Sequence, residues 1–277
     1  MNRTNSLILI RGGGDLASGV ALRLHRVGLN MLITEKPQPL TVRRLVSFAE
    51  AVYRGKFSVE GVTSCRVDDL SEVEPILARG EIPVLVDPTG EKVLAPHSPC
   101  AAPLAIIDAR MTKRPPHILM NAAPLIIGLG PGFIAGENCH VVIETNRGHF
   151  LGRVIWEGAP EPDTGIPGVV ANQQNARVLR APSEGVFQTR VEIGARVQEG
   201  QVVAEVSGTK ITAPFEGILR GLLHDGLQVE RGLKIGDLDP RNDPRYAIQV
   251  SEKSLAIGGG VLEALLTLLE IRERLWN

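Results

Sequence analysis

The feature that most constrains this chain is a short apolar run that leads directly into a glycine turn. Residues 7–10 are continuously apolar, which is typical of a parallel strand covered on both faces. The turn Arg11-Gly12-Gly13-Gly14-Asp15 follows, and apolar residues then recur at helical spacing until Gly28. A second apolar run at residues 31–33 ends at Glu35. This pattern predicts a strand–helix–strand unit with parallel strands and a right-handed connection.

The glycine turn has the spacing of a dinucleotide-binding fingerprint, with Gly12, Gly14 and Ala17 in the three motif positions. Glycines let the backbone approach a pyrophosphate, and the free N–H groups of the following helix attract the anion. Glu35, at the end of the second strand, could accept hydrogen bonds from ribose hydroxyls. The alternative is a plain tight turn in which Asp15 caps the helix, because its carboxylate would repel a bound phosphate.

A second glycine loop, Gly128-Leu129-Gly130-Pro131-Gly132, follows another predicted strand. Loops at the carboxyl ends of parallel strands gather on one edge of a sheet, so both glycine loops could face one crevice. The predicted cofactor-binding residues are Gly12, Gly13, Gly14, Asp15, Glu35, Gly128 and Gly130. The charged segments 108–114 and 144–149 could also face a ligand, or could be ordinary solvated loops.

The remaining pattern predicts four segments. Residues 1–135 form a Rossmann-like α/β domain with a parallel sheet, and residues 136–177 form a β-hairpin connection and a linker. Residues 178–241 form a small all-β module, and residues 242–277 contain a C-terminal helix that packs back on the N-terminal domain. Within the first segment we also expect a helix at 42–53 and strands at 62–67, 84–86, 104–107 and 125–127.

The all-β module has the cadence of a biotinyl/lipoyl barrel-sandwich, because glycines and valines alternate through residues 194–206 and 226–232. Carrier modules present a lysine at a hairpin tip. Here the turn is Ser207-Gly208-Thr209, and Lys210 lies only four residues before Pro214. The sequence therefore favours a docking module, contacting a partner protein or a second copy of this chain, over a carrier.

Composition excludes several function classes. The formal net charge is -1 and aromatic residues make up 4%, which argues against a nucleic-acid binder. Residues 118–136 carry no charge, but their prolines and glycines oppose a membrane-spanning helix. No secretory signal pattern opens the sequence, so we expect a cytoplasmic protein without a membrane partner.

The three cysteines are too few and too scattered for a disulfide framework. Cys100, in a proline-rich loop, is a weak candidate for a catalytic thiol, a metal ligand or a sulfur or selenium acceptor. His97 has near metal-like spacing to Cys100, but no further ligands are evident, so we predict no metal site. Cys65 and Cys139 are expected to be packing residues.

Two segments together resemble the YqeB family of selenium-dependent molybdenum hydroxylase accessory proteins. They are the opening Ile10-Arg11-Gly12-Gly13-Gly14-Asp15-Leu16-Ala17-Ser18-Gly19 and the later Lys234-Ile235-Gly236-Asp237-Leu238-Asp239-Pro240-Arg241. The resemblance implies a maturation factor that binds a nucleotide-containing ligand, such as the dinucleotide form of the molybdenum cofactor, and docks on a molybdenum hydroxylase client. An NAD-dependent oxidoreductase is the alternative, and a selenium or sulfur relay through Cys100 is a third hypothesis. Whether the chain is an enzyme stays open at this point.

Overall fold

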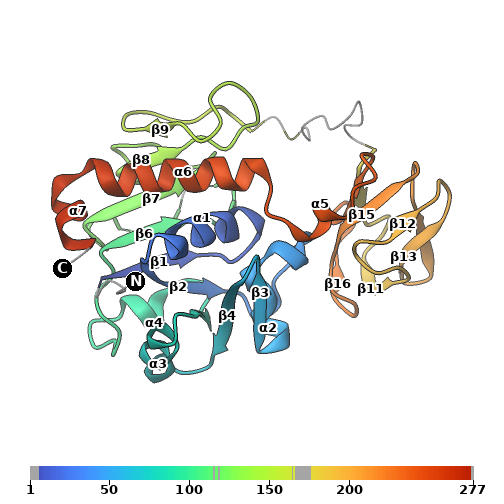
Figure 1. The fold of residues 1–277 in the computed structure, drawn as a ribbon. Coiled ribbons are helices and arrows are strands. Elements are labelled where there is room, and N and C mark those ends of the chain that lie inside the picture. Colours follow the sequence, from blue (N-terminus) through green and yellow to red (C-terminus); the bar gives the residue numbers. More distant parts are fainter. Residues whose placement is uncertain (1–5, 115, 118, 164, 166–175, 276–277) are drawn as a thin grey trace. The chain divides into compact units, whose positions relative to one another are not determined.

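The computed structural model describes all residues except 1–5, 115, 118, 164, 166–175 and 276–277 (Figure 1). The chain divides into two compact units. Unit 1 comprises Met1–Pro39, Phe48–Asp163 and Val250–Asn277, and unit 2 comprises Leu40–Ser47 and Thr164–Gln249. Each unit is therefore built from segments that are distant in the sequence.

Unit 1 is built on a nine-stranded mixed sheet with the order β3-β4-β5-β2-β1-β6-β7-β8-β9. Its strands are β1 (Leu7–Arg11), β2 (Asn30–Glu35), β3 (Lys56–Val59), β4 (Val62–Val67), β5 (Ile82–Val86), β6 (Ala105–Asp108), β7 (Leu125–Leu129), β8 (Val141–Ile143) and β9 (Val154–Ile155). The strands from β4 to β8 are parallel, whereas the edge strands β3 and β9 are antiparallel to their neighbours. The central strands are buried on both faces, as their uninterrupted apolar sequences require.

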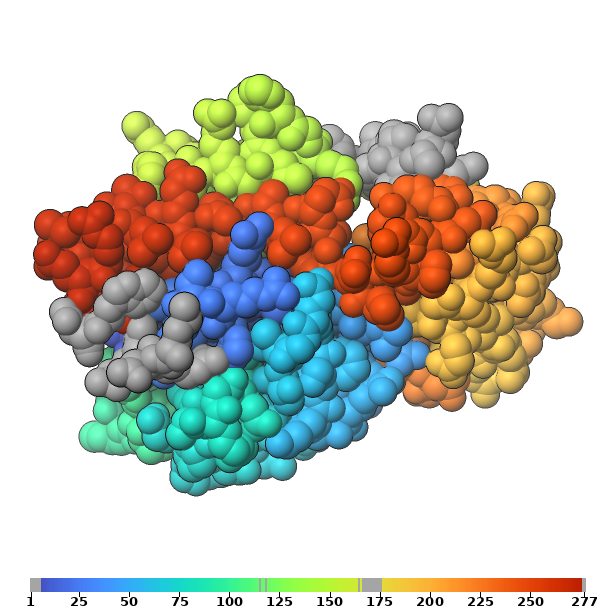
Figure 2. All heavy atoms as spheres, in the orientation of Figure 1, coloured from blue at the N-terminus to red at the C-terminus, as the bar shows by residue number. Residues whose placement is uncertain are grey.

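Helices cover both faces of this sheet (Figure 1). They are α1 (Asp15–Arg26), α2 (Ala51–Arg54), α3 (Val73–Ala78), α4 (Glu91–Leu94), α6 (Glu252–Thr267) and α7 (Leu269–Leu275), with 3-10 turns at Phe48–Glu50 and Leu70–Glu72. Leu7 and Leu9 of β1 pack in one core cluster with residues of α3 and α4. The helices α1 and α6 pack against each other, and Figure 2 shows the C-terminal helices in red beside the N-terminal segment in blue.

Glycines set the close approach of α1 and α6. A side chain at Gly258 would meet the carbonyl oxygen of Gly19 at 2.9 Å, and one at Gly19 would collide with Ser254. These pairs place the first turn of α6 beside the first turn of α1, so the two helices run in the same direction. Because α1 starts where β1 ends, both helices begin at the carboxyl edge of the sheet.

Unit 2 consists of two four-stranded antiparallel sheets and one short helix. The strand orders are β10-β17-β15-β12 and β14-β13-β11-β16. The elements are β10 (Val178–Arg180), β11 (Gly185–Thr189), β12 (Arg196–Val197), β13 (Val202–Val206), β14 (Thr209–Thr212), β15 (Gly217–Leu222), β16 (Gln228–Val229), β17 (Lys234–Asp239) and α5 (Arg245–Ile248), with a 3-10 turn at Arg44–Val46. The segment Leu40–Ser47 joins this unit through β15, since the Leu222 N–H donates to the Val42 carbonyl at 2.8 Å.

The predicted fold, a parallel Rossmann-like domain followed by a barrel-sandwich module, is wrong. The sheet of unit 1 is mixed, because β3 and β9 run antiparallel to their neighbours, and it extends through Ile155. The segment Leu40–Ser47 and α5 both pack against β15 of unit 2, so its sheets are not a free-standing lipoyl-type module. The predicted helix at 42–53 is also wrong, since only 3-10 turns and the short α2 form there.

No single helix in the described part of the chain is both long enough and apolar enough to cross a membrane. One sharply bent pair, joined at Leu268, passes that test only when its two members are taken together.

Candidate functional site

The candidate site lies at the carboxyl edge of the parallel strands of unit 1. The chain passes from β1 to β2 on one side, and later enters β6 on the other side of β1. Connections that leave a central strand in opposite directions open a crevice at the carboxyl ends, which is where ligands of open α/β sheets bind. The loops after β1, β6 and β8 lie at this edge, where a ligand of such a sheet would bind.

The first glycine loop lies at this edge, but its two buried glycines are packed from within. A side chain at Gly13 would meet the backbone nitrogen of Ala49 at 2.9 Å, and one at Gly12 would meet the Cα of Arg110 at 3.2 Å. The Ala49 N–H also donates to the Gly13 carbonyl at 2.9 Å. Close approach of the protein's own backbone thus accounts for both glycines.

Glu35 accepts the backbone hydrogen bond that a dinucleotide-binding turn would offer to its ligand. The Gly13 N–H donates to Glu35 Oε2 at 2.7 Å, and the Lys36 N–H donates to Oε1 at 2.7 Å. A carboxylate of the protein therefore holds this backbone donor of the turn. As ligand contacts, Gly12, Gly13 and Glu35 stay a prediction, and only Gly14 and Asp15 of the turn are half-exposed.

A buried ion cluster lies next to the first glycine loop, at the ends of β1 and β6. Arg11, with 1% of its surface exposed, donates to Asp108 Oδ2 at 3.0 Å and to the Thr89 carbonyl at 2.9 Å. Arg110 binds the same carboxylate through two nitrogens, at 3.0 and 2.6 Å. Asp108 thus joins the ends of β1 and β6 and fixes the start of the loop at 108–114, where Met111 and Lys113 adopt left-handed backbone conformations.

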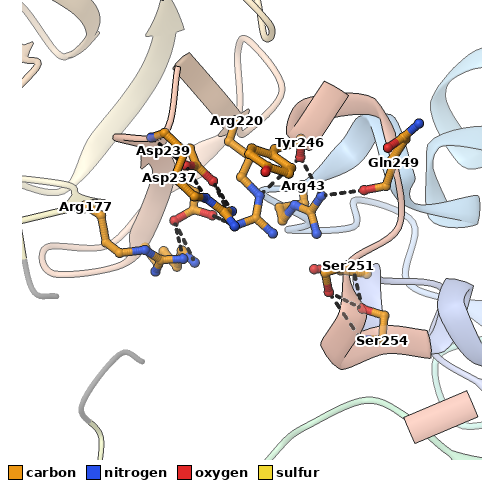
Figure 3. Close-up of polar contacts among 12 residues, drawn as sticks. Arg43, Arg177, Arg220, Asp237, Asp239, Tyr246, Gln249, Ser251 and Ser254 are labelled. Carbon is orange, nitrogen blue, oxygen red and sulfur yellow. Dashed lines mark hydrogen bonds and ion pairs between the residues drawn. The ribbon is translucent and has the colours of Figure 1, made fainter. Parts of the chain in front are cut away.

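The plain-turn alternative expected Asp15 to cap α1, and the structure differs. Gly14 holds the cap position, and Asp15 is the first helical residue. Its Oδ1 accepts a hydrogen bond from the Ser254 hydroxyl at 2.9 Å. Ser254 in turn lies 3.0 Å from the hydroxyl of Ser251, which caps α6 (Figure 3). This hydroxyl pair fixes the Asp15 carboxylate beside the first turns of both helices.

Lys253 is a further charged residue near this edge. It is half-buried in the first turn of α6, and it interacts electrostatically with Arg147, Asp15, Glu144 and Lys113. Burial, followed by Arg147, lowers the pKa of the Lys253 ammonium, and the two carboxylates only partly oppose this effect. Arg147 pairs with Glu252, and Lys113 pairs with Asp163 at 2.8 Å.

Glu144 and the second glycine loop organise the neighbouring part of the edge. The buried Glu144 carboxylate accepts from the N–H groups of Asn146 at 2.6 Å and Glu161 at 2.7 Å. Phe133 packs over Gly128, and Thr145 packs against Gly130. Packing inside the protein therefore accounts for Gly128 and Gly130 as well, and their role as ligand contacts stays a prediction.

Cys100 lies at the opposite, amino edge of the sheet. It lines a cavity of 220 Å³ together with Leu7 at the start of β1 and Asn30 at the start of β2. Burial raises the pKa of the Cys100 thiol, which disfavours the nucleophilic thiolate. The structure thus separates Cys100 from the other candidates. Within the described residues, no group of His, Cys, Asp and Glu side chains could hold a metal ion.

The segment 234–241, which carries much of the family resemblance, forms a buried ion network in unit 2 (Figure 3). Asp237 and Asp239 of β17 are each 1% exposed. Arg177 lies 3.3 Å from Asp237, and Arg220 lies 3.5 Å from Asp239. Arg241 binds Asp239 at 2.6 Å and stacks on Tyr246 at 3.8 Å. Its aspartates therefore connect β17 with Arg177, which directly precedes β10, and with β15, while Arg241 extends the network to α5.

Sequence reasoning placed Asp15 and the loops at 108–114 and 144–149 at the site, but it missed Lys253 and Ser254. One signal was present in the sequence. A lysine in the first turn of a helix opposes the helix dipole, which favours carboxylates there. Helix stability therefore does not explain this lysine.

No protein-family model matches this chain. Its likeness to solved structures is weak. An aspartoacylase family protein from Mesorhizobium loti is 12% identical, with 86% of each chain covered and a TM-score of 0.29. A succinylglutamate desuccinylase/aspartoacylase from Rhodobacter sphaeroides is 15% identical, with 87% of this chain and 88% of that chain covered and a TM-score of 0.28. At these scores the likeness carries no inference about this chain.

The predicted role in maturing a selenium-dependent molybdenum hydroxylase, with a molybdenum-cofactor dinucleotide or NAD as ligand, is wrong, and so is the alternative of an NAD-dependent oxidoreductase. Both depended on a pyrophosphate cradle at the first glycine turn. Ala49 and Arg110 lie against its buried glycines, and Glu35 takes the Gly13 N–H.

One relative covers nearly the whole chain. The "Uncharacterized protein YqeB" of Escherichia coli (strain K12) is 45% identical over 265 residues, which is 96% of this chain. This chain spans 48% of that relative's length, about half of it. The resemblance to the YqeB family, inferred from the glycine segment and the segment 234–241, is confirmed by this match.

Proposed function

We propose that unit 1 binds a small organic acid at the carboxyl edge of its sheet, in the space bounded by Asp15, Lys113, Arg147 and Lys253. These four residues, named here the edge site, come from the loops after β1, β6 and β8 and from the first turn of α6. The observation that carries the proposal is the hydrogen bond from Ser254 to Asp15 at 2.9 Å, which joins the starts of α1 and α6 beside Lys253 and the Arg147–Glu252 ion pair. Cations and helix N-termini both attract a negatively charged group.

The charge balance favours a single carboxylate over a multiply charged phosphate. Arg147 and Lys113 already pair with Glu252 and Asp163. Asp15 and Glu144 also lie within electrostatic range of Lys253. A second or third negative charge on the ligand would therefore meet carboxylates of the protein, and each repulsion weakens binding.

Calorimetric titration of the purified chain tests this proposal, with lactate as the small carboxylate and inorganic phosphate as the comparison anion. We expect saturable lactate binding that weakens about tenfold or more, about 1.4 kcal/mol, in Arg147→Gln. Arg196→Gln is the matched control, because Arg196 is an exposed arginine of unit 2 whose ion pair with Glu216 is long, at 3.8 Å. Equal lactate affinity in the two variants would contradict the proposal, and preference for phosphate would refute the assigned ligand class.

A further inference from the structure

A second cluster of reactive side chains surrounds the thiol of Cys65 at one margin of the unit 1 sheet. Cys65 lies in β4, and Lys56 lies directly opposite it in the edge strand β3. Glu81 comes immediately before β5, the other neighbour of β4, and Arg79 lies two residues earlier. These four residues, named here the thiol cluster, are separate from the residues of the edge site.

The Glu81 carboxylate holds the thiol cluster together. The Cys65 thiol donates a hydrogen bond to Oε2 of Glu81 at 3.1 Å, and the Lys56 ammonium donates to Oε1 at 3.1 Å. Arg79 Nε donates to Oε2 at 3.0 Å. The Lys56 and Cys65 side chains also hydrogen-bond each other. A sulfur and an amine nitrogen are thus held side by side against one carboxylate.

Packing alone does not explain this sulfur. Cys65 is 3% exposed and joins the apolar core cluster, as expected of a packing residue. Its thiol, however, contacts a Glu81 side chain that is 20% exposed and a Lys56 side chain that is 61% exposed. A cysteine that only fills space acts as a small apolar group and is a weak hydrogen-bond donor. This thiol instead lies at the boundary between the core and a charged surface, where a small solute can reach it.

We propose that the thiol cluster is a site of oxidative modification, at which peroxide drives a covalent bond between the Cys65 sulfur and the Lys56 nitrogen. An oxidised thiol, the sulfenic acid, condenses with a thiol or with a nitrogen. All three cysteines are free, and the group held against Cys65 is an amine, so the product here is a sulfenamide. The new bond ties the edge strand β3 to β4. This inference is independent of ligand binding at the edge site.

The chemistry balances with peroxide as the only added reactant. The Cys65 sulfur attacks one peroxide oxygen, the oxygen–oxygen bond breaks, and the thiol proton leaves with the other oxygen as water. Sulfur is thereby oxidised and peroxide is reduced, each by two electrons. The Lys56 nitrogen then bonds to sulfur as the sulfur–oxygen bond breaks. The hydroxyl group leaves as water with one ammonium proton, and a second ammonium proton is released to solvent.

Glu81 is the group placed to move these protons, because its carboxylate accepts hydrogen bonds from both reacting side chains. Burial, followed by the hydrogen bond to Glu81, raises the pKa of the Cys65 thiol. The resting protein therefore keeps a protonated thiol, and the bond forms only after an oxidant has reached the sulfur.

Hydrogen peroxide treatment of the purified chain, followed by peptide mass spectrometry, tests the cross-link directly. We expect one covalent link per chain, between the peptides that contain Lys56 and Cys65, with the loss of two hydrogen atoms and reversal by dithiothreitol. Lys56→Arg keeps the positive charge and should abolish the link. The matched controls are Lys210→Arg, in a unit 2 hairpin, and Cys100→Ser, which removes the half-exposed thiol, and neither should change the yield.

Two further measurements use the unmutated chain, so the test does not depend on how a variant folds. Reductive methylation converts lysine into a tertiary amine that keeps its charge, and it should prevent the link. Dimedone, which captures sulfenic acids, should label Cys65 and lower the yield of the link. An undiminished link in Lys56→Arg or after methylation would overturn the proposal. Oxidation of Cys65 that ends at the sulfinic acid, with Lys56 unmodified, would overturn it as well.

Discussion

Three consecutive glycines of α6 give a sharp test of how the candidate site is assembled. Gly258, Gly259 and Gly260 lie on one helix, but only Gly259 has open space around the position of an added methyl group. A methyl group at Gly258 would lie 2.9 Å from the Gly19 carbonyl and 3.2 Å from the Cα of Val20, where ordinary contact begins at 3.4 Å. A methyl group at Gly260 would collide with the Gly152 carbonyl.

The magnitudes follow from two opposing effects. Replacing glycine by alanine inside a helix stabilises it by about 1 kcal/mol, because the unfolded chain loses freedom. Overpacking against backbone costs about 1–3 kcal/mol. We therefore expect Gly259→Ala to stabilise unit 1 by about 1 kcal/mol, and Gly260→Ala to destabilise it by about 2 kcal/mol. Gly258→Ala should fall between them, since the Arg23 side chain can move but the α1 backbone cannot.

Urea unfolding followed by tryptophan fluorescence measures these differences, because Trp156 lies in unit 1. The three variants have the same change in composition at adjacent positions, so each controls for the others. If Gly258→Ala and Gly260→Ala were as stable as Gly259→Ala, the close packing of α6 on α1 and on the turn at Gly152 would be wrong. The placement of the first turn of α6 beside Asp15 would then lose its structural basis.

Three further predictions follow from buried polar groups. Asp108→Asn should destabilise unit 1 by about 3–5 kcal/mol in the same urea assay, because Arg11 keeps a buried charge without its partner; an effect below 1 kcal/mol would contradict the ion cluster. Cys139, whose pKa burial raises to about 11, should resist alkylation by iodoacetamide at neutral pH, whereas the half-exposed Cys100 should react first; the reverse order would contradict the assigned burial. His140 accepts a hydrogen bond from the Ile126 N–H at 2.9 Å, and burial lowers its pKa below 6.5, so stability should be complete above that pH and fall as the pH drops through the lowered pKa, an effect absent in His140→Gln.

The strands of unit 1 were the most predictable part of the fold. The apolar runs at 7–10, 31–33, 62–67, 84–86, 104–107 and 125–127 all coincide with strands. Each is buried in the sheet, so its hydrophobic residues report strand structure directly. Residues 136–177, expected to form a hairpin connection, contain the antiparallel strands β8 and β9 at one margin of the sheet, whereas no sequence pattern predicted the antiparallel edge strand β3.

The segment 40–47 could not be predicted from local sequence, because a distant element decides its conformation. Its apolar residues at 42, 45 and 46 favour a helix locally. In the structure the Val42 carbonyl accepts the Leu222 N–H, and Arg44 donates to the Leu222 carbonyl at 3.1 Å. These contacts hold the segment along β15 of unit 2, so tertiary packing overrides the local preference.

The glycine fingerprint shows how one pattern can serve two physical purposes. Glycine is required wherever another group comes too close for a side chain, whether that group is a ligand phosphate or the protein's own backbone. In this chain Ala49 and Arg110 lie against Gly13 and Gly12, and both come from segments that no spacing rule connects to the turn. The first turn of α6 poses the opposite problem, because its lysine conflicts with a local rule and belongs to the proposed edge site, although the motif does not contain it. A residue that local stability disfavours therefore gives a stronger indication of function here than a motif whose glycines internal packing already explains.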